Sequence, residues 1–487
     1  GKGGDVIQFV MESQGYDFTE SVRFLLDMYC HDADIHDIFE KSSPEHEEEN
    51  RLKETMYIYN KYAYEFFRSQ YDEISEESLI CKSYAEVHTT SKGVKEGRWD
   101  ADYCKTIGLG YSPRTGNKFL AFAKEKGLNI DILLKMGLIG ESDTRRGEYY
   151  DFYRGRLMIP QRDRYGRVIT FTARALNSQA SAKYLNGKDC LIYSKGKSIF
   201  GIDVALKAAR QTGKVYLVEG APDVMRLQSL GIANAVASLG GAWTREQLQT
   251  FDNFGCTLCF IPDKDLPKDG NKFGAGEEFV FKNGRLATDM GFQVTVREIP
   301  VSGHVKEDAD SYITSISKWE TLAEKDFIMW YADSTIDDQR KVISDVCDLL
   351  INVRSEVLQT SLFTDLKDKY RRANVWKSAF ADAARRKQEA KRRQASRKSD
   401  ELEGFHFYRK DYHYYDLDAQ GREREWTNFV IRPLFLISDE KHPTRIFELE
   451  NENRVKKTIE LQQSDVTKLE RFKEKIEGKG TLRFFER

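Results

Sequence analysis

The sequence lacks any long apolar run. Among its 487 residues, no window approaches the roughly 18 consecutive apolar residues that a membrane-spanning helix needs. The opening residues, GKGGDVIQFVMESQGYDF, have neither the basic start nor the apolar stretch of a secretory signal peptide. These absences predict an intracellular protein with no membrane partner.

Cysteine is scarce, and the seven cysteines do not have the spacing of a disulfide framework, which favours a reducing compartment. Cys256 and Cys259 are spaced as C-x-x-C, but in a strand such side chains point to opposite faces, and no second pair follows. Cys30, His31 and His36 lack a nearby fourth ligand. Zinc is therefore not expected in this chain.

The chain also lacks the excess of one charge that would by itself mark a polyanion-binding protein. Its 76 Lys and Arg stand against 78 Asp and Glu. Locally the balance differs, because residues 151–200 hold ten basic residues against three acidic ones, and residues 367–400 hold thirteen against four. Basic blocks on a neutral chain are typical of proteins that bind nucleic acid, although solvated faces of helices and strands also have this composition.

The fold class follows from the order of the apolar patterns. Between residues 212 and 316, the apolar stretches KVYLVEG, NAVASLGG, CTLCFIPD and GFQVTVREIP have the composition of buried strands, and helical patterns lie between them. This alternation predicts a parallel sheet covered by helices. Ligands of such sheets bind at the carboxyl ends of the strands.

Other parts are predicted on either side of this α/β domain at residues 212–316. A length of 487 residues suits about three domains. The flanking parts are a short helical region at 1–52, a basic α/β subdomain at 53–211, a helical segment with a basic linker at 317–400, and a small strand-rich domain at 401–487.

Acidic residues follow three of the predicted strands and would meet at one edge of the sheet. They are Glu219, Asp223, Asp263, Asp265, Asp308 and Asp310. Crowded carboxylates are electrostatically costly unless a divalent cation neutralises them, and oxygen ligands favour Mg²⁺ or Mn²⁺. The pattern predicts a two-metal site for phosphoryl transfer. A single Asp of this kind is more often a cap or turn residue.

Three motifs, VYLVEGAPDVMRL, FIPDKD and KEDADSYI, resemble in order and spacing the acidic motifs of the Toprim fold. The segments YYDFYRGRLMIPQRDRYGRVITFTARAL and AKYLNGKDCLIYSKGKSIFGIDVA are similar to the stretch before Toprim in bacterial DnaG-type primases. The first residues resemble the end of the primase zinc-binding domain, whose metal ligands would precede Gly1. The resemblance covers roughly residues 1–330 and suggests a primase, either alone or from a primase–helicase fusion.

The resemblance implies synthesis of short RNA primers on single-stranded DNA from ribonucleoside triphosphates. Glu219 would be the catalytic acidic residue, Asp263 and Asp265 the chief ligands of Mg²⁺ or Mn²⁺, and Asp308 and Asp310 further ligands. The residues that would face template or nucleotide phosphates are Lys92, Arg154, Arg156, Arg174, Lys183, Asn186 and Lys195. A replicative helicase would be the partner, at the nucleoid of a bacterial cytoplasm or in the host of a mobile element.

Two departures from the family pattern stand out. Lys92 takes the place of an arginine, and LPKDGNKF is inserted between Asp265 and Gly274. Two other functions stay open. A Toprim nuclease would use the same carboxylates to activate water, and a DNA-binding replication protein of a mobile element would need no catalysis. The basic hairpin favours the primase over the nuclease, and the intact Glu219 and Asp263 argue against a non-catalytic protein.

Overall fold

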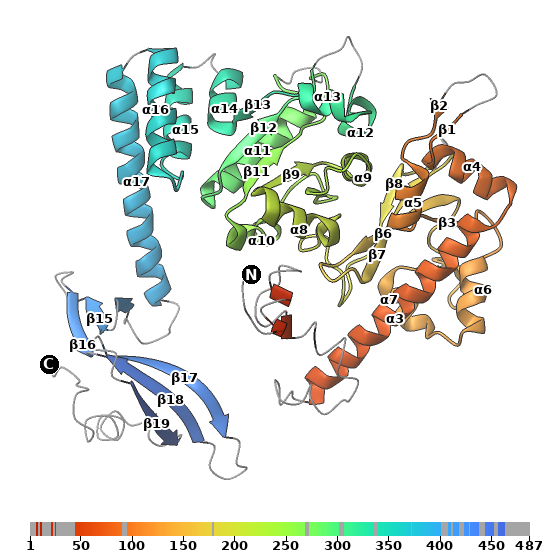
Figure 1. Ribbon diagram of the computed structural model, residues 1–487. Helices are drawn as coiled ribbons and strands as arrows, with labels where there is room; N and C mark the ends of the chain where they lie inside the picture. Colours follow the sequence, from red (N-terminus) through yellow and green to blue (C-terminus); the bar gives the residue numbers. More distant parts are fainter. Residues whose placement is uncertain are drawn as a thin grey trace. The chain divides into compact units, whose positions relative to one another are not determined.

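The structure is a computed structural model of one chain (Figure 1). It describes residues 44–89, 95–177, 180–267, 272–300, 306–335, 339–371 and 373–400, a few positions between 6 and 25, and the strands between 408 and 462. The chain divides into two compact units, residues 1–380 and 381–487. In the described ranges no helix combines the length and apolar character needed to cross a membrane.

The first unit begins with a long helix packed on an antiparallel sheet. Helix α3 (Pro44–Asp72) contacts two of the four strands, which lie in the order β3 (Gly110–Ser112), β6 (Arg156–Arg162), β7 (Val168–Ala175) and β8 (Tyr184–Asn186). The aromatic residues of α3 recur at helical spacing and form a buried face. Phe67 of this face packs edge-on against Phe171 of β7, with 5.2 Å between ring centroids.

Shorter elements complete this part of the first unit. They are α4 (Glu76–Ala85), β1 (His88–Thr89), β2 (Lys95–Glu96), α5 (Ala101–Ile107), α6 (Lys118–Glu125), α7 (Ile130–Met136), β4 (Ile139–Glu141) and β5 (Tyr149–Asp151). Strands β6 and β7 form the basic hairpin that the sequence predicts.

A five-stranded sheet follows α8 (Ile202–Thr212). Its order is β10 (Ala235–Ala237), β9 (Lys214–Val218), β11 (Thr257–Phe260), β12 (Val294–Arg297) and β13 (Glu324–Asp326). The first four strands are parallel, which confirms the predicted parallel sheet, and β13 is antiparallel to β12. The sequence did not reveal β13, because its three residues, EKD, are all polar.

Helices cover the parallel strands and leave their carboxyl ends at one edge. These helices are α9 (Ala221–Ser229), α10 (Arg245–Gln249), α11 (Ala275–Asp289) and α12 (Ala309–Tyr312), and a 3-10 turn lies at Asp252–Phe254. Figure 1 shows α11 along β11 and β12, which it contacts. Leu217, Leu258 and Val296 are fully buried in the strands. Strands buried on both faces are apolar along their length, as the sequence indicated.

The helical segment consists of α13 (Ile316–Thr321), α14 (Phe327–Thr335), α15 (Gln339–Leu350), α16 (Glu356–Tyr370) and α17 (Ala373–Asp400). The second unit holds two three-stranded antiparallel sheets. One consists of β14 (Tyr408–Lys410), β15 (His413–Leu417) and β16 (Glu423–Thr427), and the other of β17 (Phe429–Ile437), β18 (Thr444–Asn451) and β19 (Lys456–Gln462). Phe429, Leu449, Ile459 and Leu461 form a small core. The strand-rich character predicted here is confirmed.

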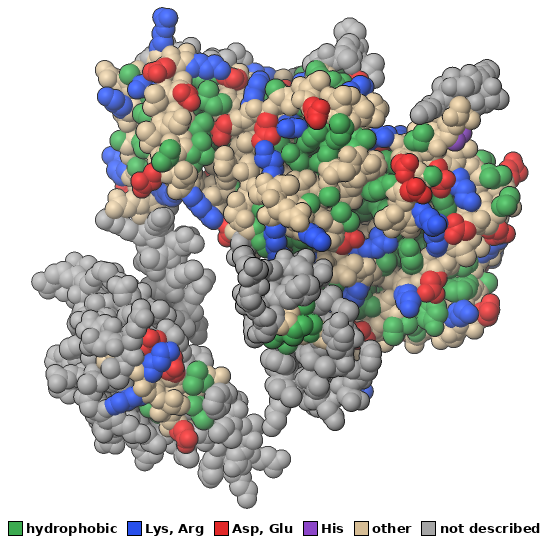
Figure 2. All heavy atoms as spheres, viewed as in Figure 1, with side chains coloured by type: hydrophobic (Ala, Val, Ile, Leu, Met, Phe, Trp, Pro, Cys, Tyr) green, Lys and Arg blue, Asp and Glu red, His purple; other side chains and the backbone are tan. Residues whose placement is uncertain are grey.

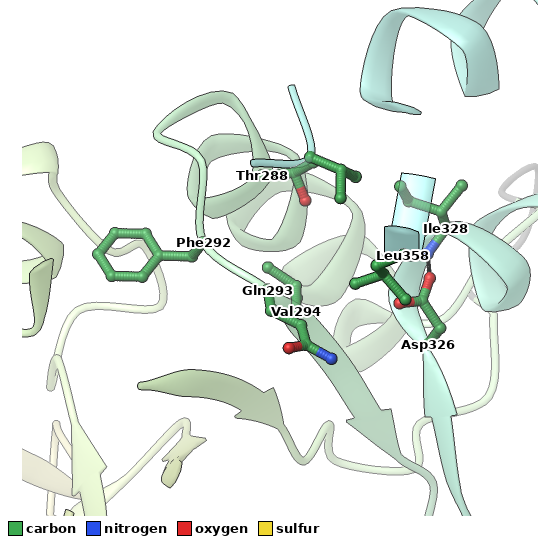
Figure 3. Close-up of a pocket in the computed structure, with 8 residues that line it drawn as sticks. Thr288, Phe292, Gln293, Val294, Asp326, Ile328 and Leu358 are labelled. Carbon is green, nitrogen blue, oxygen red and sulfur yellow. Dashed lines mark hydrogen bonds between the residues drawn. The ribbon is translucent and has the colours of Figure 1, made fainter. Parts of the chain in front are cut away.

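A small cavity lies where α11, β12 and β13 meet the helical segment (Figure 3). It is lined by Thr288, Phe292, Gln293, Val294, Asp326, Ile328, Val353 and Leu358, and its volume is about 10 Å³. That is room for about one water molecule. None of the residues predicted to carry function lines this cavity, so the candidate site has to be sought at the carboxyl edge of the sheet.

Candidate active site at the sheet edge

Glu219 and Asp223 belong to the first acidic motif. Glu219 directly follows β9, and its Oε1 atom is buried without a hydrogen-bond partner. Burial raises the pKa of Glu219, the backbone N–H of Asp263 opposes this rise, and the charge of Asp265 adds to it. Asp223 accepts two hydrogen bonds from backbone N–H groups. One comes from Gly220 at 3.0 Å and the other from Asp310 in the third motif at 3.1 Å. Asp223 therefore caps α9 and fastens the third motif to the first.

Asp263 and Asp265 follow β11 and are largely buried. Burial, together with the charges of Asp223 and Glu219, raises the pKa of Asp263 to about 9. Like charges crowded at one place disfavour ionisation, so this cluster has a deficit of positive charge.

Two glycines bring α11 against the second motif. A Cβ atom on Gly276 would lie 1.9 Å from the carbonyl oxygen of Asp263, and one on Gly274 would lie 2.2 Å from that of Asp265. No other residue type fits such a close approach. The chain therefore returns to the second motif after the insertion at residues 266–273, of which residues 268–271 lie outside the described part.

Backbone pairing joins the second and third motifs. The N–H of Lys264 donates to the carbonyl of Glu307 at 2.7 Å, and the N–H of Glu307 donates back at 3.1 Å, which forms an antiparallel bridge. In antiparallel pairing the neighbours of a bridged pair face each other, so Lys306 lies opposite Asp265. The Lys306 Nζ atom is 2.8 Å from Asp265 Oδ1 and 3.8 Å from Asp263 Oδ2. A cation of the chain itself thus contacts both carboxylates.

Asp308 and Asp310 of the third motif are engaged within the protein. Asp308 is the N-cap of α12 and accepts the N–H of Ser311 at 2.8 Å. The Asp310 side chain is 1% exposed and forms ion pairs with Arg98 and with Arg226, whose Nε atom is 3.3 Å from Asp310 Oδ1. Burial raises the pKa of Asp310, and the two guanidinium groups oppose that rise. These ion pairs engage the Asp310 carboxylate within the protein, and its role as a metal ligand stays a prediction.

The remaining carboxylates suit a divalent cation in their chemistry. Glu219, Asp263 and Asp265 offer hard oxygen ligands, and no group in the described part of the chain donates a hydrogen bond to the buried Glu219 Oε1. In the described ranges, however, no three Asp, Glu, His or Cys side chains stand ready to hold a metal ion. Lys306 contacts two of the three carboxylates. A cation there would supply the positive charge that the cluster lacks.

The free energy of unfolding of the metal-free protein is expected to depend on pH because of these acids. Burial raises the pKa of Asp223 to about 8, with the charges of Asp308 and Asp310 adding to the effect, while that of Asp263 rises to about 9, both from an ordinary value of 3.8. Between these pH values, Asp223 and Asp263 keep their protons in the folded chain but lose them in the unfolded chain. Their protonation therefore contributes to the free energy of unfolding below about pH 4, and this contribution is lost as the pH rises through 8 and 9.

Thermal denaturation in a metal chelator between about pH 6 and about pH 9 measures this effect. Asp263→Asn should have a higher melting temperature than the wild type, and the difference in melting temperature should grow with pH. Asp265→Asn, which removes the partner of Lys306, is the control and should bring no such gain. A constant difference across the pH range would contradict the raised pKa of Asp263.

Arg174 of β7 lies in a stack of arginine and tyrosine side chains. Its guanidinium is 5.1 Å from the ring centroid of Tyr184 and 5.5 Å from that of Tyr84, and its Nε donates to the Tyr84 hydroxyl at 3.1 Å. Arg98 covers the same Tyr84 ring at 4.9 Å. Because Arg98 also pairs with Asp310, the stack reaches the third acidic motif. Contacts through Tyr84 and Arg98 therefore connect Arg174, a predicted phosphate contact, with Asp310.

Lys183, Asn186 and Lys195 belong to the segment between β7 and α8. Lys183 and Lys195 are exposed, and Lys195 lies against the loop after β10, where a Cβ on Gly240 would be 3.3 Å from its Cε. The Asn186 amide donates to the carbonyl of Leu239 at 3.4 Å. The two lysines thus have ammonium groups at the surface, whereas Asn186 ties β8 to the parallel-sheet domain.

Arg154 and Arg156, two further predicted phosphate contacts, have hydrogen-bond partners within the protein. Arg156 is 6% exposed and donates to the carbonyls of Ala173 and Ala182 at 3.2 and 2.9 Å. Arg154 donates to the carbonyl of Asp151 and to the side-chain oxygen of Asn117, the residue before α6. Lys92 lies outside the described residues. The contacts of Arg154 and Arg156 with phosphate stay predictions.

Sequence patterns missed several residues of the site: Tyr84, Arg98, Tyr184, Arg226 and Lys306. Lys306 is the first residue of KEDADSYI, so a lysine inside an acidic motif was the signal for it. Arg98 is 212 positions from its partner Asp310, and no local pattern reports such a pairing.

The visible surface carries no uniform basic face. In Figure 2, basic and acidic side chains are interspersed over the described part of the first unit. Contacts with nucleic acid on this face would therefore depend on individual residues rather than on a broad positive field.

Comparison with known proteins agrees with this arrangement. Residues 85–206 match the family model of the DNA primase catalytic core, N-terminal domain, and residues 216–313 match the Toprim-like family model. The two matches cover the basic subdomain and the parallel-sheet domain with its three acidic motifs.

Curated relatives and solved structures point to the same group. DNA primase of Listeria innocua is 26% identical over 340 residues, 68% of this chain and 50% of the relative, and DNA primase of Clostridium acetobutylicum is 27% identical over 320 residues, 65% and 48%. The chain thus spans about half the length of these relatives.

Among solved structures, the fold matches the zinc-binding and RNA polymerase domains of Aquifex aeolicus primase, with a TM-score of 0.53, 24% identity, and coverage of 75% of this chain and 82% of that one. It also matches a DnaG primase catalytic domain bound to single-stranded DNA, with a TM-score of 0.52, 22% identity, and coverage of 66% and 97%. The chain therefore resembles DnaG-type DNA primases over their catalytic core, in which the N-terminal domain is followed by a Toprim-like domain.

Proposed function

We propose that this chain is a primase that joins ribonucleotides into short RNA primers on single-stranded DNA. One observation carries the proposal: the acidic edge of the Toprim-like sheet lies beside the arginine and tyrosine stack of the preceding domain. A catalyst that joins nucleotides needs both carboxylates and contacts for a nucleic-acid backbone. A relative of the same fold has been solved with single-stranded DNA, which supports that template class.

The chain's own residues divide the work. Asp263 and Asp265 would hold Mg²⁺ or Mn²⁺, which stabilises the charge on the transferred phosphoryl group when it is bound. Glu219, whose pKa is raised by burial, is suited to accept the proton of the primer hydroxyl. Arg174 would contact the template backbone, and the exposed Lys183 and Lys195 would hold template or triphosphate oxygens.

The test uses the full chain, a labelled ribonucleotide and single-stranded DNA, with Mg²⁺ or Mn²⁺. Extension of a short RNA already annealed to the template separates nucleotidyl transfer from initiation. Incorporation that depends on the cation supports the primase. Cleavage of the DNA without incorporation would show the nuclease instead, and DNA binding without either reaction would show a non-catalytic protein.

A replicative helicase, separate or fused, is the proposed partner of this activity in the bacterial cytoplasm. Co-purification of the full chain with the host's replicative helicase would support the partnership.

Neutralising the surface lysines should show which phosphates they hold. If Lys183 and Lys195 contact the template, Lys183→Ala and Lys195→Ala should each lower the slope of log affinity against log salt by roughly 0.7, the value for one phosphate on a single strand. If they hold the triphosphate, the slope stays unchanged and the apparent affinity for the nucleotide falls.

Both quantities are measured on the same variants, by salt titration of single-stranded DNA binding and by nucleotide kinetics. Lys124→Ala, a lysine in the last turn of α6, is a control expected to change neither. If neither quantity moves in either variant, these two lysines have no part in phosphate binding.

A further inference from the structure

We propose that Lys306 is a built-in counter-cation that competes with the divalent metal for Asp265, so that the site loads metal only when this lysine moves away. The inference deepens the proposed function and rests on it, because it concerns the metal requirement of the same carboxylates. It assigns a role to a basic residue that stands at the head of an otherwise acidic motif, KEDADSYI.

The position of Lys306 is fixed by the backbone. The bridge between Lys264 and Glu307 consists of two hydrogen bonds, and it sets the third motif in register with the second. Lys306 and Asp265 are the flanking residues that this register brings opposite each other. The backbone therefore places Lys306 opposite Asp265, within reach of its carboxylate.

The ammonium group contacts both carboxylate oxygens of Asp265. Lys306 Nζ is 2.8 Å from Oδ1 and 3.1 Å from Oδ2, and it lies 3.8 Å from Asp263 Oδ2. An ammonium has three donors and no lone pair to offer, so it cannot be a metal ligand. A divalent cation that binds Asp265 has to displace the ammonium, because two positive charges on the same carboxylate repel each other.

Displacement is physically easy for this side chain. Lys306 is 62% exposed, whereas the two aspartates are largely buried. Lysine has a flexible stem and can place its ammonium in water at little cost. Lys306 therefore neutralises part of the cluster while the metal is absent and withdraws toward solvent when the metal binds.

The experiment measures Mn²⁺ binding by electron paramagnetic resonance, which needs no catalytic turnover. Wild type, Lys306→Gln and Lys306→Arg are compared on the full chain, with Lys325→Gln as the matched control. Lys325 is similarly exposed and pairs with Glu298 at 3.5 Å, in a pair that involves none of the site's acids.

We expect Lys306→Gln to bind Mn²⁺ at least about fivefold more tightly than the wild type, a difference of about 1 kcal/mol. Lys306→Arg, which keeps the charge, and Lys325→Gln should stay within about twofold of the wild type. In a chelator, Lys306→Gln should melt below the wild type, and saturating Mn²⁺ should remove that difference.

Equal Mn²⁺ affinity of Lys306→Gln and wild type would overturn the role of Lys306 and leave the proposed primase intact. Weaker binding by Lys306→Gln would overturn it as well, because the lysine would then assist the metal. Absence of binding in all four proteins would overturn the inference together with the metal-dependent function. The two failures are thus distinguishable.

Discussion

Replacing Glu219 by Gln is expected to lower the rate of nucleotide addition by at least about a thousandfold, within the range for loss of a general base that also faces a metal. The residue directly follows β9, its buried Oε1 has no hydrogen-bond partner among the residues that the structure describes, and its side chain lies near Asp263 and Asp265. Glutamine keeps the size of the side chain but neither accepts the proton nor carries the charge. Single-turnover extension of an annealed RNA at saturating Mn²⁺ measures the rate.

The control for this variant is Glu298→Gln. Glu298 belongs to the same domain, is partly exposed and pairs with Lys325. It should retain full activity. Circular dichroism and melting of Glu219→Gln in a chelator check that the fold is intact. A rate within tenfold of the wild type would remove Glu219 from the catalytic machinery while leaving Asp263 and Asp265 as the metal ligands.

Asp310→Ala is expected to lower the free energy of unfolding by about 3 kcal/mol, near the lower end for a broken buried ion pair. Asp310 is almost fully buried and pairs with Arg98 and with the largely buried Arg226. Its removal leaves two guanidinium groups without their anion. Because Arg98 is partly exposed and can reach water, the loss should not reach the upper end of the range.

Chemical denaturation with a spectroscopic probe of the first unit measures the loss. Asp333→Ala, which breaks a more exposed pair with Lys369, serves as the control and should cost less than about 1 kcal/mol. If Asp310 were instead a metal ligand, Asp310→Ala would weaken Mn²⁺ binding and leave the metal-free stability nearly unchanged. That result would support the prediction, drawn from the motif, that Asp310 is a metal ligand.

Local sequence patterns were sufficient to predict those parts of the fold in which a strand and its functional residues follow each other directly in the chain. The strands before Glu219 and Asp263 are near-continuous apolar runs, so the parallel sheet and the edge at which its acids meet could be predicted. The three polar residues of β13 carry no such pattern, and their pairing with β12 depends on the tertiary fold.

The candidate site shows the same division. The acids could be named from three motifs, but not what each of them contacts. Asp310 looks like Asp308 in KEDADSYI, yet it is buried against Arg98, from a different domain of the core. Arg156 looks like Arg174 in the hairpin, yet its donors are taken up by carbonyl groups. Sequence spacing reports the residue types, whereas long-range packing decides which are available to a ligand.

The position of Arg98 has a thermodynamic consequence. Its guanidinium pairs with Asp310 of the acidic edge and covers the ring of Tyr84, whose hydroxyl accepts a hydrogen bond from Arg174. A cation bound at the acids and a backbone phosphate bound, as proposed, at Arg174 would therefore act on one continuous set of contacts. Binding free energies linked in this way are reciprocal: whatever factor a cation contributes to template affinity, the template contributes equally to cation affinity.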